Sequence, residues 1–177
     1  MVSIRKILNW QFRISPLVLN VEAFQLEFNP PVPLARELLR EYAAQLGIDL
    51  CFQEFETELA ELPGRYAPPK GCFLLAYSGP EATGCGAFRP LSDDLCEMKR
   101  VYVRPAYRGQ ALGRTIAEVL LKQAQLSGYR AMRLDTLVTM RPAISLYQSL
   151  GFQKIQPYYE NPIEDSVFME LNLRGAL

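Results

Sequence analysis

Residues 101–113 constrain the fold most strongly, because a strand turns directly into a helix there. Val101-Tyr102-Val103 has the β-branched and aromatic character of a strand, which Pro105 ends. Apolar residues then recur at helical spacing from Leu112 to Ala124. At such a turn, backbone N–H groups converge at the positive end of a helix dipole, which favours a phosphate site. The alternative is a tight connection without a ligand.

The composition is typical of an ordinary soluble globular protein. The chain has 177 residues, enough for one well-cored domain, and 49% of them are hydrophobic while 21% are charged. Lys plus Arg equals Asp plus Glu at 19 each, so the overall charge gives no argument for nucleic acid or an anionic membrane as partner.

The cysteine and histidine content narrows the chemistry. The sequence has no histidine, and Cys51, Cys72, Cys85 and Cys96 show no Cys-x-x-Cys spacing. We therefore expect no metal site and no histidine base. Three of the cysteines lie in predicted strands, where reduced, buried thiols are typical of a cytosolic protein, so we expect a cytoplasmic location.

The chain divides into an N-terminal extension of unknown role, residues 1–20, and one domain over 21–177. The extension has a basic start and an apolar stretch, but Pro16 and Asn20 interrupt it. It is too short to span a membrane and has no small-residue cleavage site.

Periodicity and turn residues predict one mixed α/β domain. The predicted strands are 22–28, 72–77, 83–88, 95–103, 131–136, 152–156 and 166–172, and the predicted helices are 34–46, 52–62, 111–126 and 142–150. Short connections make 72–77, 83–88 and 95–103 an antiparallel meander, and the linking helix makes 95–103 and 131–136 parallel. We expect residues 65–71 to form a loop.

Two motifs in this order give the chain a family resemblance. They read Val103-x-x-x-x-Arg108-Gly109-x-Ala111-x-Gly113 and Ala143-x-x-Leu146-Tyr147-x-x-x-Gly151-Phe152. With the order of elements, they resemble the GCN5-related N-acetyltransferases (GNAT), which transfer acetyl from acetyl-CoA to an amine. The resemblance covers about residues 22–173. It implies a single GNAT-like α/β (α+β) domain with acetyl-CoA as cofactor. The implied sheet is mixed, mostly antiparallel, splayed at a central strand and flanked by helices.

The resemblance also implies the cofactor contacts, because in this family main-chain amides of the turn hold the CoA pyrophosphate. At the turn, the matching residues are Arg108, Gly109, Gln110, Ala111, Leu112, Gly113 and Arg114. In the family, the strand before the turn splays at a bulge and pairs with pantetheine, which implicates the backbone of Val101, Tyr102 and Val103. Core packing is the alternative for Val101 and Val103.

Two residues depart from the family pattern. Ala111 stands where most members have Gly, which is tolerable if this residue has helical φ and ψ. Met140 stands where many members have an Asn that touches CoA, so we expect that contact to be absent or made differently.

Glu97 is one candidate for catalysis. By alternation it shares a sheet face with Lys99, Val101 and Val103. It also lies six residues before Val103, where the histone-acetylating members of the family place their base. A partly apolar cleft raises a carboxylate pKa, which would let Glu97 accept a proton directly or through water. The alternative is an exposed strand residue paired with Lys99 or Arg100.

Tyr147 is the second candidate, at the family's general-acid position four residues before Gly151. A phenol within reach of the cofactor sulfur would protonate the departing thiolate. The alternative is packing, since Ile144, Leu146 and Leu150 form the apolar face of the same helix.

The resemblance places the acceptor between residues 49–61 and 158–165, which are acidic and aromatic. The residues that give them this character include Asp49, Glu54, Glu56, Glu58, Tyr158, Tyr159, Glu160, Glu164 and Asp165. Such residues suit a cationic amine, although charged segments are commonly just solvated.

Three functions follow as hypotheses. The chain is an N-acetyltransferase for a small-molecule or amino-acid-like primary amine, an acetyltransferase for a protein N-terminus or lysine, or a non-catalytic CoA-binding sensor. We expect a small-molecule partner rather than nucleic acid or membrane, with a homodimer left open.

Overall fold

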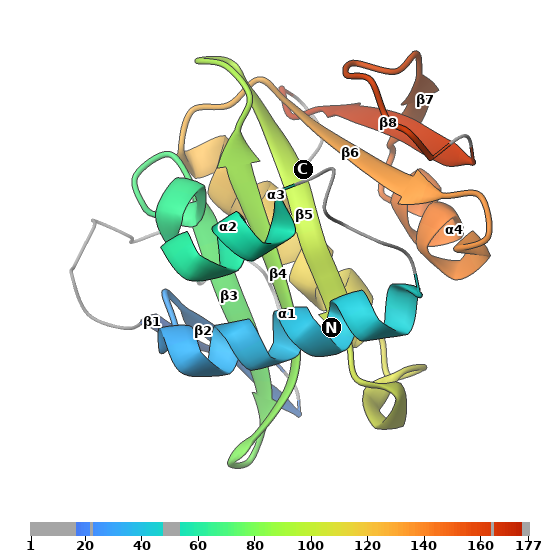
Figure 1. The fold of residues 1–177 in the computed structure, drawn as a ribbon. Coiled ribbons are helices and arrows are strands. Elements are labelled where there is room, and N and C mark those ends of the chain that lie inside the picture. Colours follow the sequence, from blue (N-terminus) through green and yellow to red (C-terminus); the bar gives the residue numbers. More distant parts are fainter. Residues whose placement is uncertain (1–16, 22, 48–53, 164, 175–177) are drawn as a thin grey trace.

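The computed structural model describes residues 17–21, 23–47, 54–163 and 165–174. Residues 1–16, Cys51, Phe52 and the predicted acceptor residues Asp49 and Glu164 lie outside these ranges. The strands are β1 Leu17–Val21, β2 Phe24–Phe28, β3 Cys72–Ser78, β4 Glu81–Pro90, β5 Leu95–Val103, β6 Ala131–Leu137, β7 Gln153–Ile155 and β8 Ser166–Asn172. They form one mixed sheet in the order β1-β2-β3-β4-β5-β6-β8-β7 (Figure 1).

The pairing confirms the predicted topology. From β1 to β5 each strand is antiparallel to the next, which includes the meander of β3, β4 and β5. β5 and β6 are parallel, as a helical crossover requires. β8 then runs antiparallel between β6 and β7.

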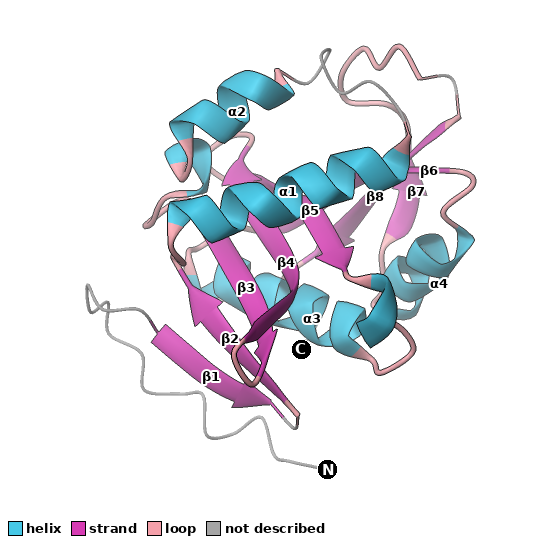
Figure 2. Ribbon diagram, turned by 60° about the horizontal axis from the view of Figure 1, so that its bottom comes forward, coloured by secondary structure: helices cyan, strands magenta, loops and turns pink. Residues whose placement is uncertain are grey.

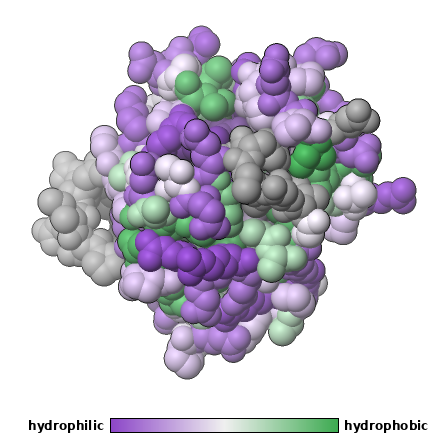
Figure 3. Space-filling model, in the orientation of Figure 1, coloured by the Kyte–Doolittle hydropathy of each residue, from purple (hydrophilic) through white to green (hydrophobic). Residues whose placement is uncertain are grey.

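Helices cover both faces of the sheet, as Figures 1 and 2 show from two directions. On one face lie α1 Val32–Leu46 and α2 Phe55–Glu61, and on the other α3 Leu112–Leu126 and α4 Arg141–Ser149. Each pair of helices buries its own apolar cluster against the sheet. The outer side of α1 carries mainly hydrophilic residues, which are visible in Figure 3.

Local sequence explains where α1 begins and ends. Pro33 sits in the first turn, where its missing N–H is not needed. Leu38 and Leu39 face the sheet and are fully buried. Gly47 then takes a left-handed conformation with φ 65°, which ends the helix.

Two elements differ from the sequence prediction. β1 extends the sheet into the segment that we predicted as an extension, because Leu17 to Val21 pair in register with β2 despite the interrupting Asn20. A 3₁₀ helix, Gly64–Tyr66, overlaps the start of the predicted loop at 65–71. Its last residue, Tyr66, is only 2% exposed. Burial of its ring fixes this short turn.

A β-bulge in β5 reverses the predicted side-chain alternation. Ala87 pairs with Lys99 and Cys85 pairs with Tyr102, so Gly86 of β4 spans the two residues Arg100 and Val101. Arg100 has φ 60°. The extra residue puts Met98, Val101 and Val103 on the α3 face. Our prediction that Glu97 shares a face with Val101 and Val103 is therefore wrong.

Candidate active site

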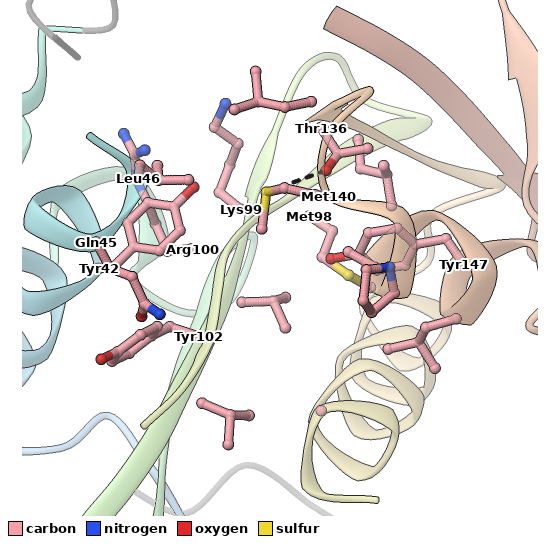
Figure 4. Close-up of a pocket in the computed structure, with 18 of the residues that line it drawn as sticks. Tyr42, Gln45, Leu46, Met98, Lys99, Arg100, Tyr102, Thr136, Met140 and Tyr147 are labelled. Atoms are coloured by element: carbon pink, nitrogen blue, oxygen red, sulfur yellow. Dashed lines mark hydrogen bonds between the residues drawn. The ribbon is translucent and has the colours of Figure 1, made fainter. Parts of the chain in front are cut away.

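A cleft opens where β5 and β6 separate. Their pairing covers only Leu95–Glu97 against Ala131–Arg133, although both strands continue beyond it. The cleft has a volume of about 640 Å³ and is lined by residues from α1, β5, the start of α3, β6 and α4 (Figure 4). The predicted splay at a central strand is present at this point.

The strand-to-helix turn forms one end of the cleft. Its lining residues there are Arg108, Gly109, Ala111, Leu112, Gly113 and Arg114. Gly109 has φ 77°, and Thr115 N–H donates to the Ala111 carbonyl as the first bond of α3. The preceding amides of Leu112 to Arg114 therefore have no partner within the helix and are suited to an anion. Gln110, which we also predicted to bind cofactor, does not line the cleft.

Ala111 departs from the conformation that we assumed for it. It has φ 59° and ψ 3°, the left-handed region, rather than helical angles. An L residue with a Cβ pays about 1–2 kcal/mol for this conformation, whereas glycine does not. The turn thus forces Ala111 into a strained conformation directly before α3.

Arg108 connects the turn to α1. Its Nε donates to the Val103 carbonyl at 3.0 Å, and its Nη2 donates to Gln45 Oε1 at 2.7 Å. Val101, Tyr102 and Val103, which we expect to pair with pantetheine, all line the cleft. The Tyr102 ring packs edge-on against Tyr42 of α1, with centroids 6.2 Å apart.

Met140 lines the cleft where β6 passes into α4. Its sulfur accepts a hydrogen bond from Thr136 Oγ1 at 3.7 Å. The Met140 thioether presents an apolar surface at the position where the family resemblance implied an Asn amide.

Tyr147 reaches the cleft from α4, on the wall opposite Tyr42 (Figure 4). Its ring packs edge-on against Phe152 at 5.7 Å, and the residue is 8% exposed. Burial, with further contributions from Tyr42 and Asp135, raises the pKa of its phenol well above the ordinary value. The raised pKa keeps the phenol neutral. Its hydroxyl has no hydrogen-bond partner among the described residues, so it is available to a ligand as donor.

Glu97 does not line the cleft and is only 1% exposed. Oε2 accepts from Arg89 Nε at 2.8 Å, and Oε1 accepts from the Tyr158 hydroxyl at 2.7 Å. Lys99 Nζ lies 4.0 Å from Oε1. The pairing with Lys99 that we considered is present, but Glu97 is buried rather than exposed. Its nearer partners come from β4 and the loop after β7, which local sequence does not reveal.

Two buried ion pairs lie beside the cleft that were not predicted from the sequence. Lys99 Nζ lies 2.9 Å from Asp135 Oδ1, and the Arg100 guanidinium donates twice to Glu58 at 2.8 Å. Burial opposes ionisation of both carboxyls, yet Lys99 and Arg100 respectively outweigh it and lower the pKa of Asp135 and of Glu58. The available signal was the charge of Glu97, Lys99, Arg133 and Asp135, which alternate along β5 and β6 on the side of the sheet away from α3.

The predicted acceptor segments are therefore only partly available to a ligand. Arg100 engages Glu58, and Glu97 engages Tyr158. Asn161 and Ile163 of the loop between β7 and β8 line the cleft directly.

Known proteins with similar sequences and folds agree with this architecture. Residues 34–152 match the acetyltransferase (GNAT) family. An uncharacterized N-acetyltransferase of Schizosaccharomyces pombe is 43% identical over 138 residues, covering 77% of this chain and 85% of that protein.

Solved structures share the fold. An acetyltransferase from Streptococcus agalactiae superposes with a TM-score of 0.72 at 22% identity, covering 86% of this chain and 99% of that one. An acetyltransferase from Salmonella typhimurium, solved with its cofactor acetyl-CoA, has a TM-score of 0.66 at 21% identity and covers 86% of this chain and 95% of that one. The chain therefore belongs to the acetyltransferase (GNAT) family, acyl-CoA-dependent N-acetyltransferases that use acetyl-CoA.

Proposed function

We propose that this N-acetyltransferase transfers acetyl from acetyl-CoA to the primary amine of a small-molecule or amino-acid-like acceptor. The amine attacks the thioester directly while both substrates are bound. The observation that carries the proposal is a single cleft with the free amides of the α3 N-terminus at one end and Tyr147 farther along it. One ligand can thus bind its phosphates at the turn and present its sulfur near a phenol.

In this proposal, the pyrophosphate of the cofactor binds to the turn residues that line the cleft, Arg108, Gly109, Ala111, Leu112, Gly113 and Arg114. Gln110 is part of the turn but does not line the cleft. The backbone of Val101, Tyr102 and Val103 pairs with pantetheine, as an added strand would.

Tyr147 acts as general acid. The bound ammonium first loses one proton to solvent water, which gives the neutral amine. The amine nitrogen then bonds to the acetyl carbon, the C–S bond breaks with its electron pair on sulfur, and the Tyr147 hydroxyl protonates that thiolate. The phenolate recovers its proton from the nitrogen, which carries one proton in excess after the attack, directly or through water. Glu97 has no direct contact with the acceptor and acts as a positioning residue, because it holds Lys99 and Tyr158.

The test measures CoA release with a thiol reagent while acetyl-CoA is mixed with polyamines, free amino acids, arylalkylamines and a lysine-containing peptide. We expect release to depend on a free small amine. Release with the peptide alone would replace this proposal with a protein acetyltransferase. The melting temperature with acetyl-CoA alone reports cofactor binding separately, and a ligand at 100 times its Kd adds about 2.7 kcal/mol of stability.

We propose a cytoplasmic location and a small-molecule partner. Supporting this location, Cys72, Cys85 and Cys96 are free and buried. Within the described ranges, no helix is long and apolar enough to cross a bilayer, and no cluster of metal-ligating side chains occurs. Sedimentation of the purified protein tests the open alternative of a homodimer.

A further inference from the structure

Asp135 is the one carboxylate that lines the cleft among the residues described. It lies on β6, two residues beyond the last residue paired with β5. Its carboxyl group therefore sits close to the apex of the splay, where the two strands part. The Asp135 side chain is 11% exposed, so it is largely buried but still reaches the cleft surface.

Lys99 fixes the carboxylate from the opposite strand. The Nζ to Oδ1 distance of 2.9 Å uses one oxygen of Asp135, and the Tyr159 phenol also faces the group. An ionised carboxylate accepts about four hydrogen bonds, so capacity for a ligand donor remains. Its lowered pKa, which Lys99 causes against the effect of burial, keeps the group charged at neutral pH.

The other charged residues lining the cleft are cations, Lys99, Arg100, Arg108 and Arg114. Arg108 and Arg114 belong to the turn at the phosphate end. Lys99 pairs with Asp135, and the Arg100 guanidinium lies 5.8 Å from the centre of the Tyr42 ring of α1. Glu58 neutralises Arg100 from outside the cleft. Without Asp135, an ammonium group entering this half of the cleft would be repelled by Lys99. Only Glu97, whose Oε1 lies 4.0 Å from Lys99 Nζ, would then offset the charge of Lys99.

We propose that Asp135 is the specificity-determining residue for the acceptor and receives the ammonium group of a cationic amine, with Lys99 as the residue that positions it. The inference rests on the proposed acetyltransferase function and names the group that selects its substrate. Tyr147 lines the same cleft as Asp135, so an amine held at Asp135 shares that cleft with the proposed acid.

The experiment compares Asp135→Asn with wild type on two probes, benzylamine, which is cationic at neutral pH, and aniline, which is not. For each, calorimetry on the CoA-loaded protein gives Kd without turnover, and acetyl-CoA assays give KM and kcat. Losing a charged hydrogen bond weakens binding by about 10-fold or more. We expect that loss for benzylamine only, with the KM for acetyl-CoA unchanged and with Asp135→Glu restoring part of the preference.

The matched control is Glu170→Gln. Glu170 lies on β8 outside the cleft, and its carboxylate accepts a hydrogen bond at 2.6 Å from Arg133 of β6, the strand that also carries Asp135. This variant should leave the preference intact. Lys99→Met removes the residue that positions Asp135, so it should reduce the preference for benzylamine without abolishing it. Equal weakening of both probes in Asp135→Asn, or a preference that survives it, overturns the assignment. Wild type that binds acetyl-CoA yet neither binds nor acetylates either probe also overturns it, whereas failure to bind acetyl-CoA overturns the proposed function itself.

Discussion

At the scale of single residues, Tyr147 combines burial with a hydroxyl that has no hydrogen-bond partner in the described part of the chain. A tyrosine that served only packing would normally place its hydroxyl against a partner. Here the ring is packed against Phe152, while the oxygen faces a cleft that is large enough for a ligand. The packing role and the chemical role thus belong to different atoms of one side chain and can be separated.

We predict that Tyr147→Phe keeps the fold and the affinity for acetyl-CoA while lowering kcat by about 10²–10⁴-fold, because only the acid is lost. The measurements are steady-state kinetics with a reactive amine, together with thermal unfolding. The expected pattern is a drop in kcat with little change in KM for acetyl-CoA. Unchanged turnover under conditions where chemistry limits the rate would show that another donor protonates the thiolate.

Ala111 gives a second prediction at this scale. Because it occupies the left-handed region with φ 59°, Ala111→Gly should stabilise the protein by about 1 kcal/mol and leave cofactor binding intact. Denaturant unfolding measures the change. Gly113→Ala is the matched comparison, since Gly113 is helical and a Cβ there would lie 3.8 Å from Val103 and 3.9 Å from Leu146. A destabilised Ala111→Gly would mean that the strain at this turn is absent.

At the scale of elements, the turn before α3 depends on its backbone rather than on its side chains. Gly109 has φ 77°, and a Cβ added to it would meet no atom within 4 Å, so conformation and not space restricts this site. Proline fixes φ near −65° and removes an N–H.

We therefore predict that Gly109→Pro abolishes acetyl-CoA binding, because the amides of the α3 N-terminus lose their arrangement. Calorimetric titration with acetyl-CoA measures the effect, and circular dichroism shows whether the sheet and helices persist. Gly79→Pro, at another positive-φ turn between β3 and β4, is the control for general damage to a turn. A Gly109→Pro protein that binds acetyl-CoA normally would place the phosphate elsewhere.

The sequence predicted most elements because their signals are local. The strand 95–103, the helix that begins at 111 or 112 and the strand 166–172 each carry their own periodicity. The family resemblance implied a bulge in this strand, but its position at Arg100 was not predictable from local periodicity, because it depends on the pairing with Gly86 of β4. It decides the site all the same, since one extra residue moved Glu97 to the face opposite Val101 and Val103.

Across the fold, buried ion pairs join α2 to the sheet and the two halves of the sheet to each other. Arg100 ties β5 to Glu58 of α2, and Lys99 ties β5 to Asp135 of β6. Removing one partner of such a pair leaves a buried charge uncompensated, which typically costs about 3–5 kcal/mol.

These pairs set the pH dependence of stability. The folded-state pKa values of Glu58 and Asp135 are lowered, so the unfolded chain binds more protons and stability falls as pH drops below about 4, through the folded pKa values. With no histidine in the sequence, we expect a plateau between about pH 5 and 8. Denaturant titrations across this range measure it, and a transition near pH 6.5 would contradict it.

The short pairing of β5 with β6 makes the protection of both strands from hydrogen exchange depend on the cofactor. Only three residue pairs join these strands directly, so backbone groups farther along β5 lack a neighbouring strand on the cleft side. A cofactor that fills the gap takes the place of that neighbour. Hydrogen exchange of main-chain amides in β5 and β6 should then slow together when acetyl-CoA binds, as though the sheet had gained a strand.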